Sequence, residues 1–494
     1  MPCLPRLTFL TALLASAGLH AEPMLFTPCA DTAVPGSLCS GLNLPGGYDE
    51  QGDALAGEED RVHVFVRKIA ADVPAGKRPK GSLWLVSGGP GESGASFYNL
   101  LPTLRRSFPG FEFLIPDHRG TGHSTRLCRV EESEHSPGGR ALVGAEWGSC
   151  FAGLNLVPEV AGHFSITSAA RDLKALIEGE HEGKNNRGQP PVYLYGVSYG
   201  TQLVLRTLQL GPLPVKGVIL DSLVPPQTDP RWDLSQRSHV VNQVGLQVLA
   251  QCDADAACHV ALGEPAATLY RRVLDKALAD PALLAKIPGK NLKNFLGGLL
   301  DIPAARARIP YLLQDLDKGG ETELAAVRET LKTAAASLGS YPQSPLSMPL
   351  VNIISNSENN LQPSLRPDWT AADIDREEAD LLFTSPLPRI LLGGGLPTYP
   401  HDRYFGQLPA KMPPPLVLQG TLDPKTPYAG AQAQVDALTK ARAGKVALAT
   451  IQHAPHFILW TAPACFEQAS QRFIAGKPVQ DCQPGANRPT AALP

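Results

Sequence analysis

Val192-Tyr-Leu-Tyr-Gly-Val-Ser198-Tyr-Gly-Thr-Gln-Leu-Val-Leu-Arg-Thr-Leu-Gln-Leu210 is the most informative stretch of this 494-residue chain. Its apolar start, residues 192–195, predicts a buried strand, and residues 201–210 have the apolar spacing of a helix. Between them lies Gly196-x-Ser198-x-Gly200, which permits a sharp strand-to-helix turn because the two glycines avoid steric clashes. Such a turn exposes a hydroxyl at a helix start, where developing negative charge is favoured. Ser198 is therefore a candidate nucleophile; an ordinary glycine turn is the alternative.

A serine nucleophile needs a base, and the base needs an orienting carboxylate. Both residue types follow predicted strands near the C-terminus. The strand at 416–418 leads to Asp423, and the strand at 445–451 leads to His453 and His456. Because parallel neighbours end at one sheet edge, these loops are expected beside the turn at Ser198. The chain order serine, acid, histidine also fits the strand–turn–helix type of site.

We predict Asp423 as the acid and His456 as the base. His456 lies farther into its loop than His453, where a reaching base is expected, but His453 stays a rival. Asp221 follows the predicted strand at 218–220 and is the rival acid.

A glycine-rich loop, Ser87-Gly-Gly-Pro-Gly-Glu-Ser-Gly94, follows the predicted strand at 82–86. Its backbone can approach a substrate carbonyl closely, so it is a candidate oxyanion hole together with the N–H of Tyr199. Gly89 is the expected donor and Gly88 the alternative, because Pro90 has no N–H. Nucleotide binding is disfavoured, since no Lys-Ser or Lys-Thr pair follows the glycines.

Two regions alternate apolar strands with helical patterns, which predicts an α/β fold with a mostly parallel sheet. Between them, residues 225–414 contain helical segments and many prolines, and they predict a mostly helical insertion. We therefore predict an export signal at 1–21, a first core part at 22–224, a cap insertion at 225–414 and a second core part at 415–494. The predicted strands are 61–69, 82–86, 111–115, 192–195, 218–220, 416–418 and 445–451, and the main predicted helices are 168–178, 201–210, 236–251, 266–279, 321–338, 428–442 and 465–475.

Composition and charge exclude several classes of protein. Hydrophobic residues make up 43% of the chain and charged residues 18%, as expected for a protein with a core rather than a disordered one. The net charge is −3 without long runs of one sign, so we expect no nucleic-acid partner. No obligate protein partner is inferred.

The N-terminus has the pattern of a cleavable export signal. Arg6 precedes an apolar stretch that ends before small residues near position 21. This stretch is too short to span a bilayer, and no later segment is long and apolar enough, so no membrane span is expected. The signal predicts a periplasmic or secreted protein.

The cysteines agree with export, because disulfides persist in oxidising compartments. Removal of Cys3 with the signal leaves an even number, and we favour pairing between neighbours in sequence, although many pairings are formally possible. Zinc binding is the alternative, but the chain has no Cys-x-x-Cys pair, and no metal or organic cofactor is expected. The expected pairs are Cys29–Cys39, Cys128–Cys150, Cys252–Cys258 and Cys465–Cys482.

Taken together, these motifs resemble the tripeptidyl-aminopeptidase-like branch of the prolyl aminopeptidase family. This resemblance implies the α/β-hydrolase fold, a mostly parallel central sheet with helices on both faces and a helical cap over the site. Ser198, Asp423 and His456 then correspond by position to nucleophile, acid and base. The motifs that carry the resemblance are Gly-Gly-Pro-Gly at 88–91, Asp-His-Arg-Gly-Thr-Gly at 117–122, Gly-Val-Ser-Tyr-Gly at 196–200, Gly-Thr-Leu-Asp-Pro-Lys-Thr-Pro at 420–427 and the Cys465–Cys482 segment.

The chain departs from the family pattern at three motifs. Ser87 stands where the family often has His or Asn, His118 where it usually has Gln, and Ala-Pro precedes His456 where Gly-His-Gly is usual. These departures bear on substrate and efficiency more than on reaction type. Arg119 in the same motif is expected to form a structural ion pair.

The resemblance implies a serine exopeptidase that acts on small peptides near their N-termini through an acyl-enzyme. Such an enzyme must recognise an ammonium group, and a carboxylate under the cap is the natural partner. Glu358 is the first candidate and Glu92, beside the glycine loop, the second; either could instead be a solvated surface acid. Two other functions stay open: an esterase or lipase-like hydrolase of small esters, and a catalytically silent binding protein.

Overall fold

The computed structural model describes residues 24–49, 51–55, 61–181, 189–393, 395–442 and 446–485. The predicted export signal at 1–21, with Cys3, lies outside these residues.

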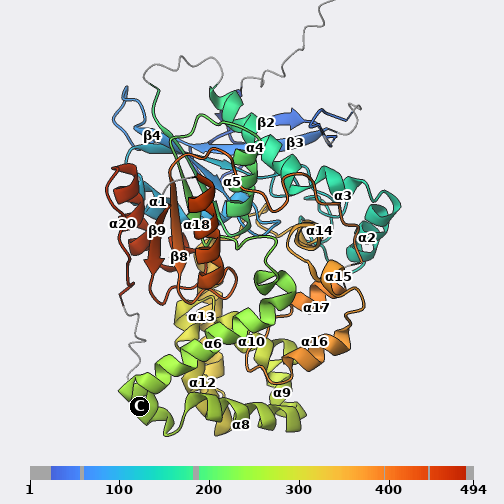
Figure 1. Cartoon of the computed structure of the whole chain (residues 1–494), viewed down its shortest axis with the longest axis vertical. Helices are drawn as coiled ribbons and strands as arrows, with labels where there is room; N and C mark the ends of the chain where they lie inside the picture. The colour runs from blue at the N-terminus through green and yellow to red at the C-terminus, as the bar shows by residue number, and fades with distance from the viewer. Residues whose placement is uncertain are drawn as a thin grey trace, which may run out of the picture.

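A single mixed sheet forms the centre of the molecule (Figure 1). Its described strands run in the order β1-β2-β3-β5-β4-β6-β7-β8-β9; β1, β2, β3 and β5 are paired antiparallel and the remaining neighbours parallel. All seven predicted strands are present, and β1 and β2 were not predicted. The strands are β1 Thr27–Pro28, β2 Leu38–Leu44, β3 Val62–Ile69, β4 Gly81–Val86, β5 Phe111–Pro116, β6 Val192–Val197, β7 Gly217–Asp221, β8 Pro415–Gly420 and β9 Ala447–Ile451.

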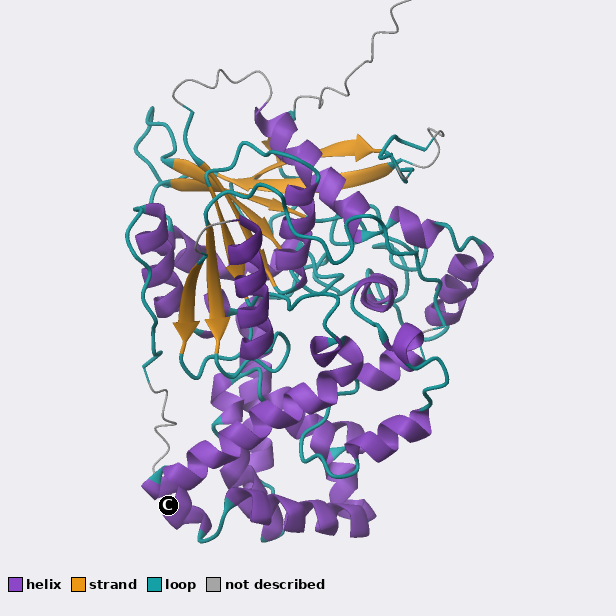
Figure 2. Cartoon of the chain, viewed as in Figure 1, coloured by secondary structure: helices purple, strands orange, loops and turns teal. Residues whose placement is uncertain are grey.

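Helices cover both faces of the sheet (Figures 1 and 2). On one face α4 (Ile166–His181), α5 (Tyr199–Gln209) and α18 (Tyr428–Arg442) pack on the strands. On the other face lie α1 (Leu101–Ser107) and α20 (Pro463–Ile474). The fully buried strands contribute alternate residues to the two layers, as the two-residue period of a strand requires. The prediction of helices on both faces is confirmed.

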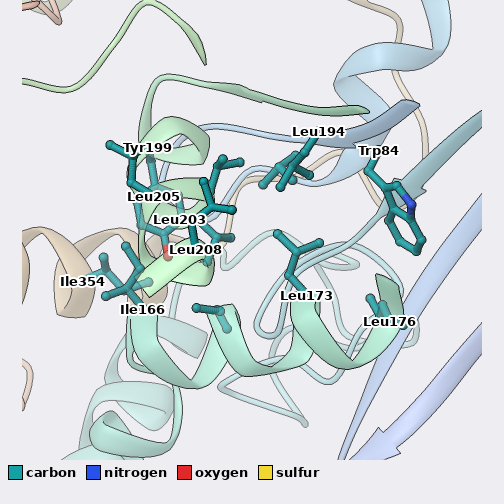
Figure 3. Packing of buried hydrophobic residues seen from close by; sticks show 14 of the residues in the cluster. Trp84, Ile166, Leu173, Leu176, Leu194, Tyr199, Leu203, Leu205, Leu208 and Ile354 are labelled. Atoms are coloured by element: carbon teal, nitrogen blue, oxygen red, sulfur yellow. The ribbon is translucent and has the colours of Figure 1, made fainter. Parts of the chain in front are cut away.

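Strand β4 illustrates this alternation. Trp84 belongs to the layer with α4 and α5, whereas Leu83 and Leu85 belong to the opposite layer. Figure 3 shows Trp84 near Leu176 of α4, with the leucines of α5 in the same cluster. Ile354, from a helix far along the chain, joins this cluster beside Ile166. A helix outside the sheet domain therefore shares its core.

The chain between β7 and β8 is helical, and its described residues contain no strand (Figure 2). We call residues 230–392 the cap. It has a hydrophobic cluster of its own, built mainly from α6, α8, α10, α12 and α13. The cap helices are α6 Arg237–Ala254, α7 Ala256–Leu262, α8 Ala266–Ala279, α9 Pro281–Lys286, α10 Leu292–Leu299, α11 Pro303–Arg306, α12 Ile309–Asp317, α13 Thr322–Leu338, α14 Met348–Glu358, α15 Gln362–Leu365, α16 Ala371–Glu378 and α17 Leu387–Leu392. Three short helices lie elsewhere: α2 Glu146–Leu156, α3 Val160–His163 and α19 Ile458–Thr461.

All four predicted disulfides are present. They join Cys29 to Cys39, Cys128 to Cys150, Cys252 to Cys258 and Cys465 to Cys482. Within the described part of the chain, no helix combines the length and apolar character needed to cross a membrane.

Candidate active site

Ser198 lies at the turn between β6 and α5, as predicted. Its backbone has φ 55° and ψ −127°, a conformation that L-residues rarely adopt. A side chain on Gly196 would place its Cβ 2.5 Å from the carbonyl oxygen of Gly200, and one on Gly200 would lie 2.6 Å from the carbonyl oxygen of Ser87. Only glycine fits at either position. Ser198 is partly exposed between buried neighbours, so the turn presents its side chain outward.

Asp423 and His456 are hydrogen-bonded at the ends of β8 and β9. His456 Nδ1 lies 2.9 Å from Asp423 Oδ2. The carboxylate also accepts the N–H groups of Lys425 and Thr426, each at 2.8 Å, and the Thr426 hydroxyl at 2.7 Å. Burial alone would raise the pKa of Asp423, but the nearby imidazole and these hydrogen bonds hold it below the ordinary value. Asp423 is therefore an ionised acceptor that fixes the imidazole.

Ser198 and His456 line one pocket of about 390 Å³. The pocket opens where the carboxyl ends of β6, β8 and β9 meet the cap, the usual place for a ligand in an α/β sheet. The two candidate oxyanion donors, Gly89 and Tyr199, line it as well. A Cβ on Gly88 would lie 3.1 Å from the Ser198 Cβ, so the glycine loop passes directly beside the serine.

The rival base and the rival acid have other partners. His453 Nδ1 pairs with Gln251 of the cap at 2.9 Å, and His453 lines a different pocket from Ser198. Asp221 is fully buried and accepts the backbone N–H groups of Ile458 at 2.9 Å and Leu459 at 3.0 Å. Asp221 therefore fastens the segment that follows His456.

Ser222 completes this fastening. Its hydroxyl accepts the N–H of Phe457 at 2.8 Å and donates to Asp221 at 3.0 Å. Three successive backbone amides after His456 are thus held by the two residues at the end of β7. The sequence offered no local signal for this arrangement, because the partners are distant in the chain.

The two candidate ammonium ligands have different surroundings. Glu92 lines the pocket with Ser198. Burial raises the pKa of Glu92, and the positive Lys425 opposes that rise. Glu358 is buried, forms an ion pair with Arg206 at 3.2 Å and accepts a hydrogen bond from Gln227 at 2.8 Å. Burial raises the pKa of Glu358 too, with Arg206 as the opposing charge. Glu358 is not among the described residues that line the pocket.

Two cationic residues of the pocket were missed in the sequence: Arg237, the first residue of α6, and Lys425, two residues after the acid. Lys425 Nζ lies 3.1 Å from Asp301 Oδ2 of the cap. Lys425 belongs to the Asp-Pro-Lys-Thr-Pro motif, so its place near the acid could have been inferred. Arg237 had no such signal. In the described part of the chain, no cluster of three or more His, Cys, Asp or Glu side chains could hold a metal ion.

Arg119 forms the expected structural ion pair. Its guanidinium donates to both oxygens of Asp172 at 2.6 Å and to the carbonyl of Gly46 at 2.6 Å, with both charged groups buried. The pair ties the loop after β5 to α4, and Arg119 has no place in the pocket.

Comparison with known proteins agrees with this architecture. Residues 82–249 match the family model of the alpha/beta hydrolase fold, and residues 393–481 match that of the TAP-like proteins. The serine protease Hip1 of Mycobacterium tuberculosis is 24% identical over 505 aligned positions, covering 92% of this chain and 89% of that protein. The tripeptidyl aminopeptidase of Streptomyces lividans is 30% identical over 172 positions, or 31% of this chain and 30% of that enzyme.

The first match covers the turn at Ser198 and the glycine loop, and the second covers β8 and β9, which lead to Asp423 and His456. The mostly parallel sheet with helices on both faces agrees with the fold that these two matches indicate. The two family matches and the named relatives together support a TAP-like serine peptidase of the α/β-hydrolase fold.

Proposed function

We propose that the protein is an exported serine exopeptidase that hydrolyses peptide bonds near the N-terminus of small peptides. The observation that carries the proposal is that His456, hydrogen-bonded to Asp423 at 2.9 Å, lines the same pocket as Ser198. The relatives named serine protease and tripeptidyl aminopeptidase support a peptide substrate. The four disulfides support a destination in an oxidising compartment, periplasmic or extracellular.

The reaction is acyl transfer in two halves. Ser198 Oγ attacks the scissile carbonyl while His456 Nε2 takes the hydroxyl proton, and Asp423 stabilises the imidazolium that forms. The N–H groups of Gly89 and Tyr199 hold the oxyanion. His456 then protonates the leaving amine, and the C–N bond breaks to leave an ester on Ser198. Water, deprotonated by His456, attacks this ester and releases the acid.

Glu92 is the proposed ligand of the substrate ammonium. It lines the pocket with the nucleophile, whereas the Glu358 carboxylate already has Arg206 and Gln227 as partners. The sequence favoured Glu358, and the proposal reverses that order. A carboxylate held in a partly dry pocket gives a charge-assisted hydrogen bond to an ammonium more strength than it has in water.

The test is a panel of aminoacyl, dipeptidyl and tripeptidyl arylamides, each with a free or an acetylated amine. We expect hydrolysis of the free-amine forms and loss of activity on acetylation. Ser198→Ala should lower kcat by several orders of magnitude. Ser364→Ala, at an exposed cap serine, is the matched control and should leave kcat unchanged. Glu92→Gln should raise KM for free-amine substrates and reduce the effect of acetylation.

Other outcomes would replace the proposal. Hydrolysis of short acyl esters with no action on any arylamide identifies an esterase. A physiological function that survives Ser198→Ala identifies a binding protein. Acetylated and free-amine substrates cleaved equally well would remove the exopeptidase assignment while keeping the peptidase.

A further inference from the structure

Most of the charged side chains of the pocket have hydrogen-bonded or ion-paired partners within the protein. Asp229 lines the pocket and pairs at 2.5 Å with Arg231, which lies outside the lining. Asp233 accepts backbone N–H groups, including that of Leu361 at 2.6 Å. Asp301 is paired with Lys425, and His456 of the lining is hydrogen-bonded to Asp423 behind it.

Arg237 is the exception among the cations. Its side chain lines the pocket, and within the described residues its guanidinium makes no hydrogen bond or ion pair. The buried arginines elsewhere differ, since each is paired with a carboxylate: Arg67 with Asp31, Arg119 with Asp172, Arg126 with Glu132 and Arg206 with Glu358. Arg237 is partly exposed in the pocket, so an anionic ligand that enters meets a guanidinium whose donors are not taken by any residue that the structure describes.

The electrostatic surroundings of Arg237 agree with this conclusion. Burial lowers the pKa of Arg237, and the more distant charges of Asp423 and Asp301 only oppose that change. Lys425 differs, because the adjacent Asp301 raises the pKa of its ammonium. Asp301 is thus bonded to one of the two cations, and Arg237 remains without a bonded anion.

The same pocket holds Glu92, an acid that forms no ion pair among the described residues. One anion and one cation are therefore available to a ligand in a single cavity of about 390 Å³. This size is within the range of small-molecule sites. A small peptide carrying both an ammonium and a carboxylate matches these two charges.

We propose that Arg237 binds a carboxylate of the peptide substrate and makes the enzyme selective for peptides that carry one. This inference rests on the proposed peptidase function. The planar guanidinium can donate two parallel hydrogen bonds to a carboxylate, which gives both affinity and orientation. The carboxylate comes either from the C-terminus of a short peptide or from an acidic side chain.

The experiment compares matched peptides. Trialanine as the free acid is set against trialanine amide, and amidated tripeptides with one glutamate at each position in turn are set against their glutamine counterparts. Release of free amine measures kcat/KM. For the wild type we expect kcat/KM about 10- to 100-fold higher for the carboxylate-bearing member of one pair, the range of a charge-assisted hydrogen bond. Which pair responds identifies the source of the carboxylate.

Arg237→Gln should abolish this preference while leaving kcat/KM for the neutral peptides within a few-fold of wild type. Arg237→Lys should keep part of it, because the charge remains and the fork is lost. Arg271→Gln is the matched control: it removes an exposed arginine of the cap helix α8, outside the pocket lining, and should leave the preference intact. Thermal unfolding of each variant shows that it is folded.

Equal rates for charged and neutral peptides in the wild type, or a preference that survives Arg237→Gln, overturns the inference while the peptidase proposal stands. Absence of any peptide hydrolysis overturns the peptidase proposal instead. The inference then depends on calorimetric binding of trialanine and its amide to the Ser198→Ala protein. Tighter binding of the free acid, lost on adding Arg237→Gln, supports it; equal binding or none refutes it.

Discussion

His118 makes the stability of this protein depend on pH in a way that can be calculated. The side chain is 5% exposed, its Nδ1 lies 3.1 Å from the carbonyl oxygen of Arg119, and its buried Nε2 has no hydrogen-bond partner among the described residues. Burial lowers the pKa of His118 from 6.5 to about 4. The folded protein therefore disfavours the charged imidazole, which the unfolded chain accepts readily.

The sign and size follow from proton linkage. Because the folded pKa lies below the unfolded one, the stability that neutral His118 contributes is complete above pH 6.5 and is lost as the pH falls towards 4. Between pH 7 and pH 5 the unfolded chain takes up about 0.7 of a proton at this site and the folded protein about 0.1. The free energy of unfolding should fall by about 2 kcal/mol from this residue alone.

The perturbation is His118→Gln, which places a non-titrating amide where the imidazole lies. Urea unfolding of both proteins at pH 7, 6 and 5 gives the free energies of unfolding, and the difference between variants cancels the contribution of every other group. We expect the wild type to lose about 2 kcal/mol more than the variant between pH 7 and pH 5. Parallel curves for the two proteins would refute the reasoning, because His118 would then titrate normally.

Three further predictions concern the site. Asp221→Asn replaces one carboxylate oxygen with an NH₂ group, so the backbone N–H of Ile458 or of Leu459 then faces another donor. The free energy of unfolding should fall by about 1–3 kcal/mol, and kcat should fall more than KM rises. Urea unfolding and kinetics check this, and an unchanged kcat contradicts the positioning role. Asp423→Asn should reduce kcat by about 10³–10⁴-fold with KM little changed, because loss of the orienting carboxylate has this effect in serine peptidases. A reduction of less than tenfold would indicate that another residue is the acid. Gly200→Ala should cost about 1–3 kcal/mol of overpacking in thermal unfolding, while Gly148→Ala, where a Cβ meets nothing within 4 Å, should be neutral or stabilising.

Much of the sheet could be predicted because its parallel strands are continuous apolar runs bounded by glycine, proline or charge. Strand β2 escaped because Gly41 and Asn43 interrupt its pattern and most of its residues are only partly buried. It is a strand mainly through its antiparallel pairing with β3. That pairing is tertiary, and no local propensity reveals it.

The candidate site was predictable where one motif carries one function, and not where distant segments meet. Ser198, Asp423 and His456 each lie in a recognisable loop after a strand. Arg237 does not, because its surroundings are formed by a cap helix and by the loop after β8. The sequence could not decide between Glu358 and Glu92, because it does not show that Arg206 of α5 forms an ion pair with Glu358.

The neighbours β7 and β8 pair in the sheet, with Asp221 opposite Leu418, although the whole cap separates them in the chain. A growing polypeptide therefore completes the turn at Ser198 long before Asp423 and His456 are synthesised. Until the last two strands have been added, Ser198 lacks its proposed base, His456, and β7 is the edge strand of the sheet. On the proposed mechanism, a fragment that ends inside the cap lacks both Asp423 and His456 and should be inactive.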